Sequence, residues 1–289
     1  MLKGSQKIWL HKVREAEQSA CEDLIAREAP LEIRLRYGPK NHRRERTFAI
    51  LMRTPGEDEA LALGLLFTEQ LIASASQVLS MRYEEARHRA PLQGQRLLID
   101  LPAGHRTEAL LEEERLIAGN SACGICGATL MEQLERQPGY LNLRDEPRIG
   151  RERLFSLPEK LQQAQELFGC TGGLHAAGLF SASAKLLLRF EDVGRHNALD
   201  KLIGHALRRQ MLPLNRHILM LSGRISFELV QKAAMAGIGL ICAIGAPSSA
   251  AVEAADNYGI TLVGFLKKKS FNLYTHTQRI LHAPPDKEQ

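Results

Sequence analysis

The fold class is clearest in KLLLRFEDVGRHNALDKLIGHALRR, residues 185–209, where a short apolar run is followed after one polar turn by a helical pattern. The same alternation of apolar runs with helices of about three turns continues to residue 266. The further segments are HILMLSG (217–223), SFELVQKAAMAG (226–237), GLICAIG (239–245), SSAAVEAADNYG (248–259) and TLVGFL (261–266). Continuous apolar strands between helices are typical of parallel βαβ units, so we predict a layered α/β domain over residues 151–281.

A smaller α+β subdomain is predicted over residues 46–150. TFAILM (47–52) has the composition of a strand, and ALALGLLFTEQLI (60–72) has the apolar spacing of a buried helix. QVLSMRY (77–83) and RLLIDLP (96–102) flank a loop with Pro91 and Gly94, which predicts a hairpin.

The two ends of the chain and the start of the α/β domain carry weaker patterns. Residues 1–45 are predicted to form an arm, with a mixed helical stretch before the strand LEIRLRY (31–37), and residues 282–289 form a tail. The cluster KNHRRER (40–46) is predicted to be a solvated basic turn, because no aromatic residue interrupts its charges. In SLPEKLQQAQELFG (156–169), Ser156 as a cap and Pro158 in the first turn predict a helix that a glycine ends.

Composition narrows the class of protein. The chain has 289 residues, of which 44% are hydrophobic and 25% charged, as expected for a globular protein of one large or two modest domains. A net charge of +5 favours an anionic ligand but is too small to indicate a nucleic-acid partner. Without a secretory signal or an apolar run of about 18 residues, we expect a cytoplasmic protein with no membrane partner.

The predicted strands end in polar, glycine-rich turns. Because ligands bind at the carboxyl edge of such sheets, the turns after the four strands together predict a site for a phosphate-bearing ligand. Positive charge there comes from Arg195, Arg224 and residues 267–269, while Gly194 and Gly223 permit close approach of the backbone. Helices expected to begin after Asn197, Ser226 and Pro247 would direct amide donors into the crevice, and His175 and His196 are candidate contacts. Neither a dinucleotide fingerprint nor a phosphate-loop motif occurs in the sequence.

Cys123 and Cys126 are the only cysteines that lie close together in the sequence. Structural zinc would need a second close pair, and a dithiol catalyst would need a thioredoxin-like context, so the sequence disfavours both. A third possibility is a persulfide-carrying nucleophile, because a predicted helix begins just after Cys126 and would favour the thiolate. Inert thiols remain an alternative. The glycine-rich segment 117–129 is expected to be mobile.

Seven ordered segments of the chain, between about residues 45 and 275, resemble the formate dehydrogenase accessory sulfurtransferase family. They are ALALGLLFTEQLI, CGICG, TGGLHAA, EDVGRHNALDKLIG, SGRISFELVQKA, APSSAAVEAA and GITLVGFLKKKSFNLY. The resemblance implies a cytidine deaminase-like α/β domain with a smaller N-terminal subdomain, paired as a homodimer. It also implies passage of sulfur from a cysteine desulfurase to the bis-guanine dinucleotide molybdenum cofactor, before that cofactor enters the catalytic subunit of formate dehydrogenase.

The resemblance also assigns roles to residues. Cys123 would bear the persulfide with Cys126 as its partner, and Phe265 to Ser270 would contact the guanine dinucleotide, for which GDP is an analogue. No zinc is expected, because Ala176 and Ala177 follow His175 in place of the deaminase signature. The candidate cofactor-binding residues are Gly172, Gly173, His175, Asp192, Gly194, Arg195, His196, Asn197, Ser222, Gly223, Arg224, Ser226, Phe265, Leu266, Lys267, Lys268, Lys269 and Ser270. The alternative is a cofactor-binding chaperone whose thiols are structural or redox-responsive and transfer no sulfur.

Overall fold

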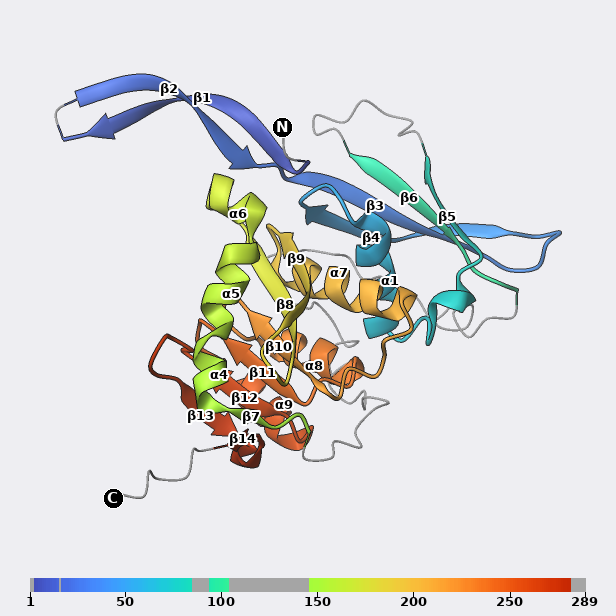
Figure 1. Cartoon of the computed structure of the whole chain (residues 1–289). Helices are drawn as coiled ribbons and strands as arrows, with labels where there is room; N and C mark the ends of the chain where they lie inside the picture. The colour runs from blue at the N-terminus through green and yellow to red at the C-terminus, as the bar shows by residue number, and fades with distance from the viewer. Residues whose placement is uncertain (1–2, 16, 85–93, 104–145, 282–289) are drawn as a thin grey trace, which may run out of the picture.

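A computed structural model describes residues 3–15, 17–84, 94–103 and 146–281 of the chain. These residues form a six-stranded mixed sheet, a four-stranded sheet and two sheets of two strands each. The colours of Figure 1 show that the six-stranded sheet comes from the second half of the chain, and the four-stranded sheet from the first. No helix in the described ranges is long and apolar enough to cross a membrane.

The six-stranded sheet has the order β13-β12-β11-β10-β8-β9. Its three central parallel strands, β10, β11 and β12, are the apolar runs that the sequence indicates. Both sides of this trio are antiparallel, because β8 runs against β10 and β9, and β13 runs against β12. The α/β class is therefore observed, and the four strands that the sequence indicates, β9, β10, β11 and β12, run in the same direction. The sheet is mixed because β8 and β13, which the sequence analysis did not predict, run against their neighbours. The strands are β8 (His175–Ser181), β9 (Leu186–Asp192), β10 (His217–Leu221), β11 (Leu240–Ala243), β12 (Thr261–Gly264) and β13 (Asn272–Thr275).

Sequence reasoning missed β8, which lies between β9 and β10. The middle of this strand is small where a helix packs closely against it: a Cβ atom at Gly178 would stand 2.8 Å from Leu161 Cδ1. Ala176, Ala177 and Gly178 have low strand propensity, so only Leu179 and Phe180 carry a strand signal within β8. With β8 inside the sheet, β9 becomes an edge strand that is half-exposed rather than buried on both faces.

Helices cover both faces of this sheet, so the domain has three layers (Figure 1). One face packs against α7 (Arg195–Arg208), α8 (Phe227–Met235) and α9 (Ser249–Asn257), through residues such as Leu219, Ile241 and Leu262. The other face packs against α4 (Arg151–Phe155) and α5 (Leu157–Ala164), which α6 (Glu166–Thr171) continues. Layering of the cytidine deaminase kind stays a prediction.

The single helix expected over residues 156–169 is wrong in detail, because it is split between α5 and α6. Ser156 is shared by the end of α4 and the start of α5, and its hydroxyl donates to Arg153 O at 2.7 Å rather than accepting from α5. The glycine that ends the segment is Gly172, with φ of 67°, three residues beyond the expected stop. A left-handed residue at this position favours glycine.

The first half builds a four-stranded sheet, of order β4-β3-β6-β5, and one buried helix, α1 (Asp58–Thr68). The predicted strand before α1 and the hairpin of β5 with β6 are confirmed. Residues of α1 and α7 belong to one hydrophobic core that includes side chains from both halves of the chain. The proposed domain boundaries therefore stay predictions. The strands are β3 (Ala29–Tyr37), β4 (Arg44–Arg53), β5 (Ser80–Glu84) and β6 (Gln95–Asp100), and the 3-10 turn η1 (Ala75–Gln77) precedes β5.

The arm at the N-terminus is a hairpin of two long strands, β1 (Ser5–Arg14) and β2 (Glu17–Ala26). The helical stretch predicted there is wrong, because pairing along both strands, with Lys7 Nζ 2.8 Å from Glu22 Oε2, overrides the local helical preference. Figure 1 shows this ribbon projecting from the rest of the chain. Its Trp9 is 73% exposed.

The basic cluster at 40–46 is also more ordered than predicted. Arg43 donates to the carbonyl oxygens of Gly38 and Leu101, at 2.8 and 2.9 Å, and to Asp100 Oδ1 at 3.0 Å. It thus joins the end of β3 to the end of β6 rather than lying free in solvent. At the far end of the chain, β14 (Ile280–Leu281) follows the 3-10 turn η2 (Thr277–Arg279) and pairs with β7 (Ile149–Gly150) in parallel.

Candidate functional site

One edge of the six-stranded sheet gathers the polar turns. Because β9 is antiparallel to β8, and β8 to β10, the carboxyl end of β9 lies on the same edge as those of β10, β11 and β12. The first residue of β8, His175, pairs with Asp192 at this edge. The topology therefore brings together the four turns that the sequence singled out, and adds the start of β8.

His175 lies against the turn after β10. A Cβ atom at Gly223 would stand 3.0 Å from His175 Nδ1, so glycine is needed for this close approach. Ser222 fixes the two strands, since its Oγ accepts from the Ala176 N–H at 2.8 Å and its own N–H donates to Ala176 O at 3.0 Å. Burial lowers the pKa of His175, and the positive charges of Arg195, His196 and Arg224 lower it further. The ring is thus neutral near pH 7 and faces cationic groups.

Two arginines supply the charge at this edge. Arg195 is the first residue of α7, and its Nε is buried with no hydrogen-bond partner among the described residues. Arg224 is exposed, in the turn between β10 and α8. A buried guanidinium nitrogen without an acceptor among the described residues and an exposed guanidinium next to Gly223 are the groups that a phosphate would engage.

A carboxylate that sequence reasoning missed also lies here. His196 Nε2 lies 3.2 Å from Ser226 Oγ and 3.8 Å from Glu228 Oε2. The polar contact with His196 lowers the pKa of Glu228 to about 2, against the opposing effect of burial. Glu228 therefore stays ionised beside His196. In the sequence, Glu228 is recognisable only as an acidic residue in the first turn of α8, and such residues are also common at the start of ordinary helices.

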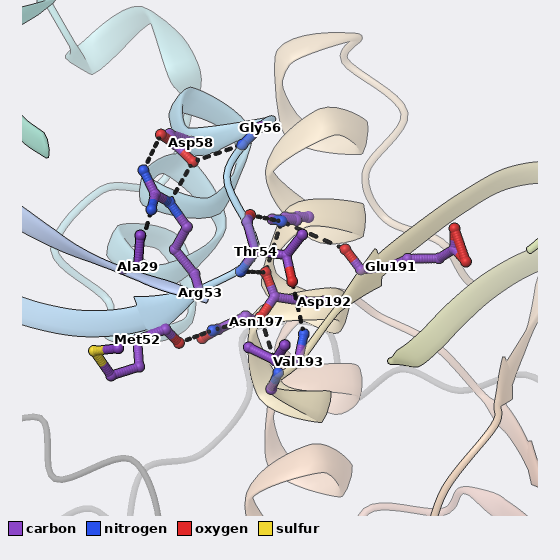
Figure 2. A network of polar contacts seen from close by, with 12 residues as sticks. Ala29, Met52, Arg53, Thr54, Gly56, Asp58, Glu191, Asp192, Val193 and Asn197 are labelled. Carbon is purple, nitrogen blue, oxygen red and sulfur yellow. Dashed lines mark hydrogen bonds and ion pairs between the residues drawn. The ribbon is translucent and has the colours of Figure 1, made fainter. Parts of the chain in front are cut away.

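Asp192 and Asn197 are predicted cofactor contacts that lie beneath the surface, 0% and 8% exposed. Asp192 accepts hydrogen bonds from the N–H groups of Gly194 and Thr54, at 2.9 and 3.1 Å, and from Asn197 Nδ2 at 2.9 Å. Lys201 Nζ lies 2.6 Å from Asp192 Oδ2, the oxygen that also accepts from Thr54. These contacts, drawn in Figure 2, hold the turn after β9 in place. The expectation that α7 begins after Asn197 is wrong, since Gly194 caps it and Asn197 lies in its first turn.

The segment from Phe265 to Ser270 follows β12. Phe265 is 41% exposed and has φ of 51°, and its N–H donates to Gly245 O at 3.1 Å, which ties it to the turn after β11. Lys267 to Ser270 are exposed, and the Lys267 N–H donates to Ser270 O at 2.8 Å. Leu266 is buried in the core beneath, so its side chain packs rather than faces solvent.

Gly172 and Gly173, also predicted contacts, are exposed and join the end of α6 to β8. Cys123 and Cys126, with the segment 117–129, lie outside the described residues. Of the cysteines that are described, Cys242 is buried, which raises the pKa of its thiol, and Cys170 is exposed. Across the described ranges, no group of three or more His, Cys, Asp or Glu side chains has the arrangement of a metal site. The expectation of no zinc therefore stays a prediction.

Comparisons with known proteins identify similar chains. The family model of the FdhD/NarQ family matches residues 26–281. A sulfur carrier protein FdhD from Sulfurisphaera tokodaii is 40% identical over 96% of this chain and 99% of its own. One of the same name from Streptomyces avermitilis is 41% identical over 93% of each chain. The crystal structure of a candidate formate dehydrogenase accessory protein from Desulfotalea psychrophila matches with a TM-score of 0.70 and 23% identity, over 96% of this chain and 99% of that one.

Proposed function

The chain belongs to the FdhD/NarQ family, and from that premise we propose that it is a sulfur carrier in the maturation of formate dehydrogenase. In this proposal Cys123 takes sulfane sulfur from a cysteine desulfurase: its thiolate attacks the outer sulfur of the donor persulfide, and the donor cysteine leaves as a thiolate. The chain then acts as a sulfurtransferase, with Cys126 as the partner thiol. The printed names of the relatives support the sulfur-carrying part.

The acceptor in this proposal is the bis-guanine dinucleotide molybdenum cofactor, which is cargo on its way to the catalytic subunit of formate dehydrogenase. The observation that supports a nucleotide site best is that His175, which lies against Gly223, is close enough to Arg195 and Arg224 to feel their charges. Each phosphate of a guanine dinucleotide needs cationic or amide donors, and this edge supplies both, including the buried Arg195 Nε. A homodimer would present two such edges.

GDP tests the nucleotide half of the proposal. Calorimetry of the full-length chain with GDP should show binding that weakens as salt concentration rises, because the contacts are charged. ADP is the matched control for the base, because it differs from GDP in the base alone, and inorganic phosphate is the control for a bare anion. Equal binding of all three would reduce the site to a general anion site, and no binding of GDP would remove the assignment.

The alternative function, a cofactor chaperone whose thiols transfer no sulfur, shares this edge and differs only at the cysteines. It predicts GDP binding with no sulfur acquired from a desulfurase. Sulfur loading of Cys123 therefore separates the two functions, whatever the affinity for GDP.

A further inference from the structure

Thr54, in the first half of the chain, uses all three of its polar groups to contact the end of β9, the turn after it and α7. Its N–H donates to Asp192 Oδ2 at 3.1 Å, and its Oγ1 accepts from the Val193 N–H at 3.1 Å. Its carbonyl oxygen accepts from Lys201 Nζ at 3.0 Å. Figure 2 shows Thr54 between the chain that leaves β4 and the residues around Asp192.

The contacts continue on both sides of Thr54. Asn197 Nδ2 donates to Met52 O at 2.9 Å as well as to Asp192 Oδ1. Next to Thr54, Arg53 forms a buried ion pair with Asp58, in which Nη2 lies 2.8 Å from Oδ2. Thr54 is therefore held rigidly, because the Arg53–Asp58 ion pair joins the end of β4 to the start of α1 on either side of it.

The turn held in this way is the one that directs the candidate anion-binding groups. Gly194 fits tightly, since a Cβ atom there would stand 2.9 Å from Asn197 Nδ2 and 3.5 Å from Asp192 Oδ1. Arg195 and His196 follow immediately as the first residues of α7. A small shift of Val193 or Gly194 would therefore move the Arg195 guanidinium and the first amide groups of the helix together.

We propose that Thr54 is a positioning residue for the nucleotide site, acting through Asp192 and Val193 to set the orientation of Gly194 and Arg195. The inference rests on the proposed function, because it concerns the same edge of the sheet. The inference goes further in one respect: a residue from the first half of the chain increases the affinity of this edge for the nucleotide without contacting the nucleotide.

The chain offers a matched control in a second buried threonine beside a second buried ion pair. Thr68 Oγ1 lies 2.9 Å from Lys232 Nζ and 3.3 Å from Asp200 Oδ1, and Lys232 Nζ lies 2.8 Å from Asp200 Oδ1. Thr68→Val thus removes a comparable buried hydroxyl without breaking any hydrogen bond of the turn at Val193 and Gly194.

The test is GDP affinity by calorimetry for the wild type, Thr54→Val, Thr54→Ser and Thr68→Val, with a thermal unfolding curve for each. Thr54→Val keeps the methyl packing against Gly4 but loses the acceptor for Val193, and should weaken GDP binding about fivefold to tenfold. Thr54→Ser keeps the acceptor and loses the methyl, so its affinity should stay within about twofold of the wild type even if its melting temperature falls. Thr68→Val should lower the melting temperature without weakening GDP binding.

Amide hydrogen exchange supplies a second readout. Exchange at Val193 should be faster in Thr54→Val than in the wild type or Thr54→Ser. If the wild type binds GDP and Thr54→Val binds equally well, the positioning role is wrong while the site stands. Equal weakening in Thr54→Val and Thr68→Val would mean general destabilisation and would also overturn the role. A wild type that does not bind GDP would overturn the proposed site together with this inference.

Discussion

Gly64 of α1 and Gly204 of α7 lie in backbone contact: a Cβ atom added at Gly204 would stand 2.6 Å from the Gly64 nitrogen and 1.9 Å from Ala60 O. The reverse substitution is as crowded, since a Cβ atom at Gly64 would stand 1.9 Å from Asp200 O. The two helices therefore approach so closely that only hydrogen atoms fit between them. Since α7 begins at the candidate site, this crossing fixes where its N-terminus points.

Gly204→Ala should destabilise the protein by about 3 kcal/mol, because backbone rather than a flexible side chain must move to admit the methyl group. Gly169→Ala in α6 is the control, since a Cβ atom there meets nothing within 4 Å. That variant should be neutral or stabilised by about 0.5 to 1 kcal/mol, because alanine favours a helix. Urea unfolding measures both, and equal stability of the two variants would contradict the close crossing.

Much of this arrangement follows from local sequence patterns, and some of it cannot. The central strands β10, β11 and β12 and the helices between them were predictable, because apolar runs and helical periods are properties of neighbouring residues. Helix α1 and the β5–β6 hairpin were predictable for the same reason. Strand β8 was not predictable, because its two alanines and its glycine reflect close packing against α5 rather than strand propensity. The β1–β2 ribbon was not predictable either, because it is stabilised by pairing between the two strands.

The candidate site divides in the same way. The polar turns could be placed at one edge from the order of strands and helices alone. The burial of Asp192 could not be predicted, because it depends on Thr54, which lies 138 residues away in the chain. Glu228 was missed because an acidic residue at a helix start has a common structural explanation. Close helix contacts such as that of Gly204 with Gly64 could not be predicted, because they do not change the hydrophobic periodicity of the sequence.

Arg224→Gln should weaken GDP binding about tenfold to a hundredfold, because it removes a charged donor from the nucleotide edge while an exposed side chain adds little to folding. Arg216→Gln is the matched control, since Arg216 is also exposed but precedes β10 at the opposite edge of the sheet, with Glu146 Oε2 3.4 Å away. Calorimetry measures both affinities. Unchanged binding in Arg224→Gln, or equal loss in both variants, would contradict the assignment of this edge.

GDP binding should take up protons at His175. Burial and the charges of Arg195, His196 and Arg224 hold the pKa of the free ring below its ordinary value of 6.5, against the opposing effect of Asp192. A bound phosphate would favour the charged ring and raise this pKa, so affinity should rise as pH falls through the pKa of the complex and level off below that of the free protein.

Calorimetry in two buffers of different ionisation enthalpy measures this proton uptake. His175→Gln is the control, because it removes the titrating ring at this position and leaves the other charged groups of the edge in place. The same proton uptake in His175→Gln and the wild type would show that His175 does not face the ligand.

Sulfur loading of Cys123 is the measurement that tests the sulfur-carrier account most directly. The full-length chain is incubated with a cysteine desulfurase and cysteine, and intact mass is recorded beside Cys123→Ser and Cys126→Ser. The account predicts a gain of one sulfur atom in the wild type, lost on treatment with a thiol reductant, retained in Cys126→Ser and absent in Cys123→Ser. A wild type that binds GDP but gains no sulfur, or a gain that persists in Cys123→Ser, would contradict it.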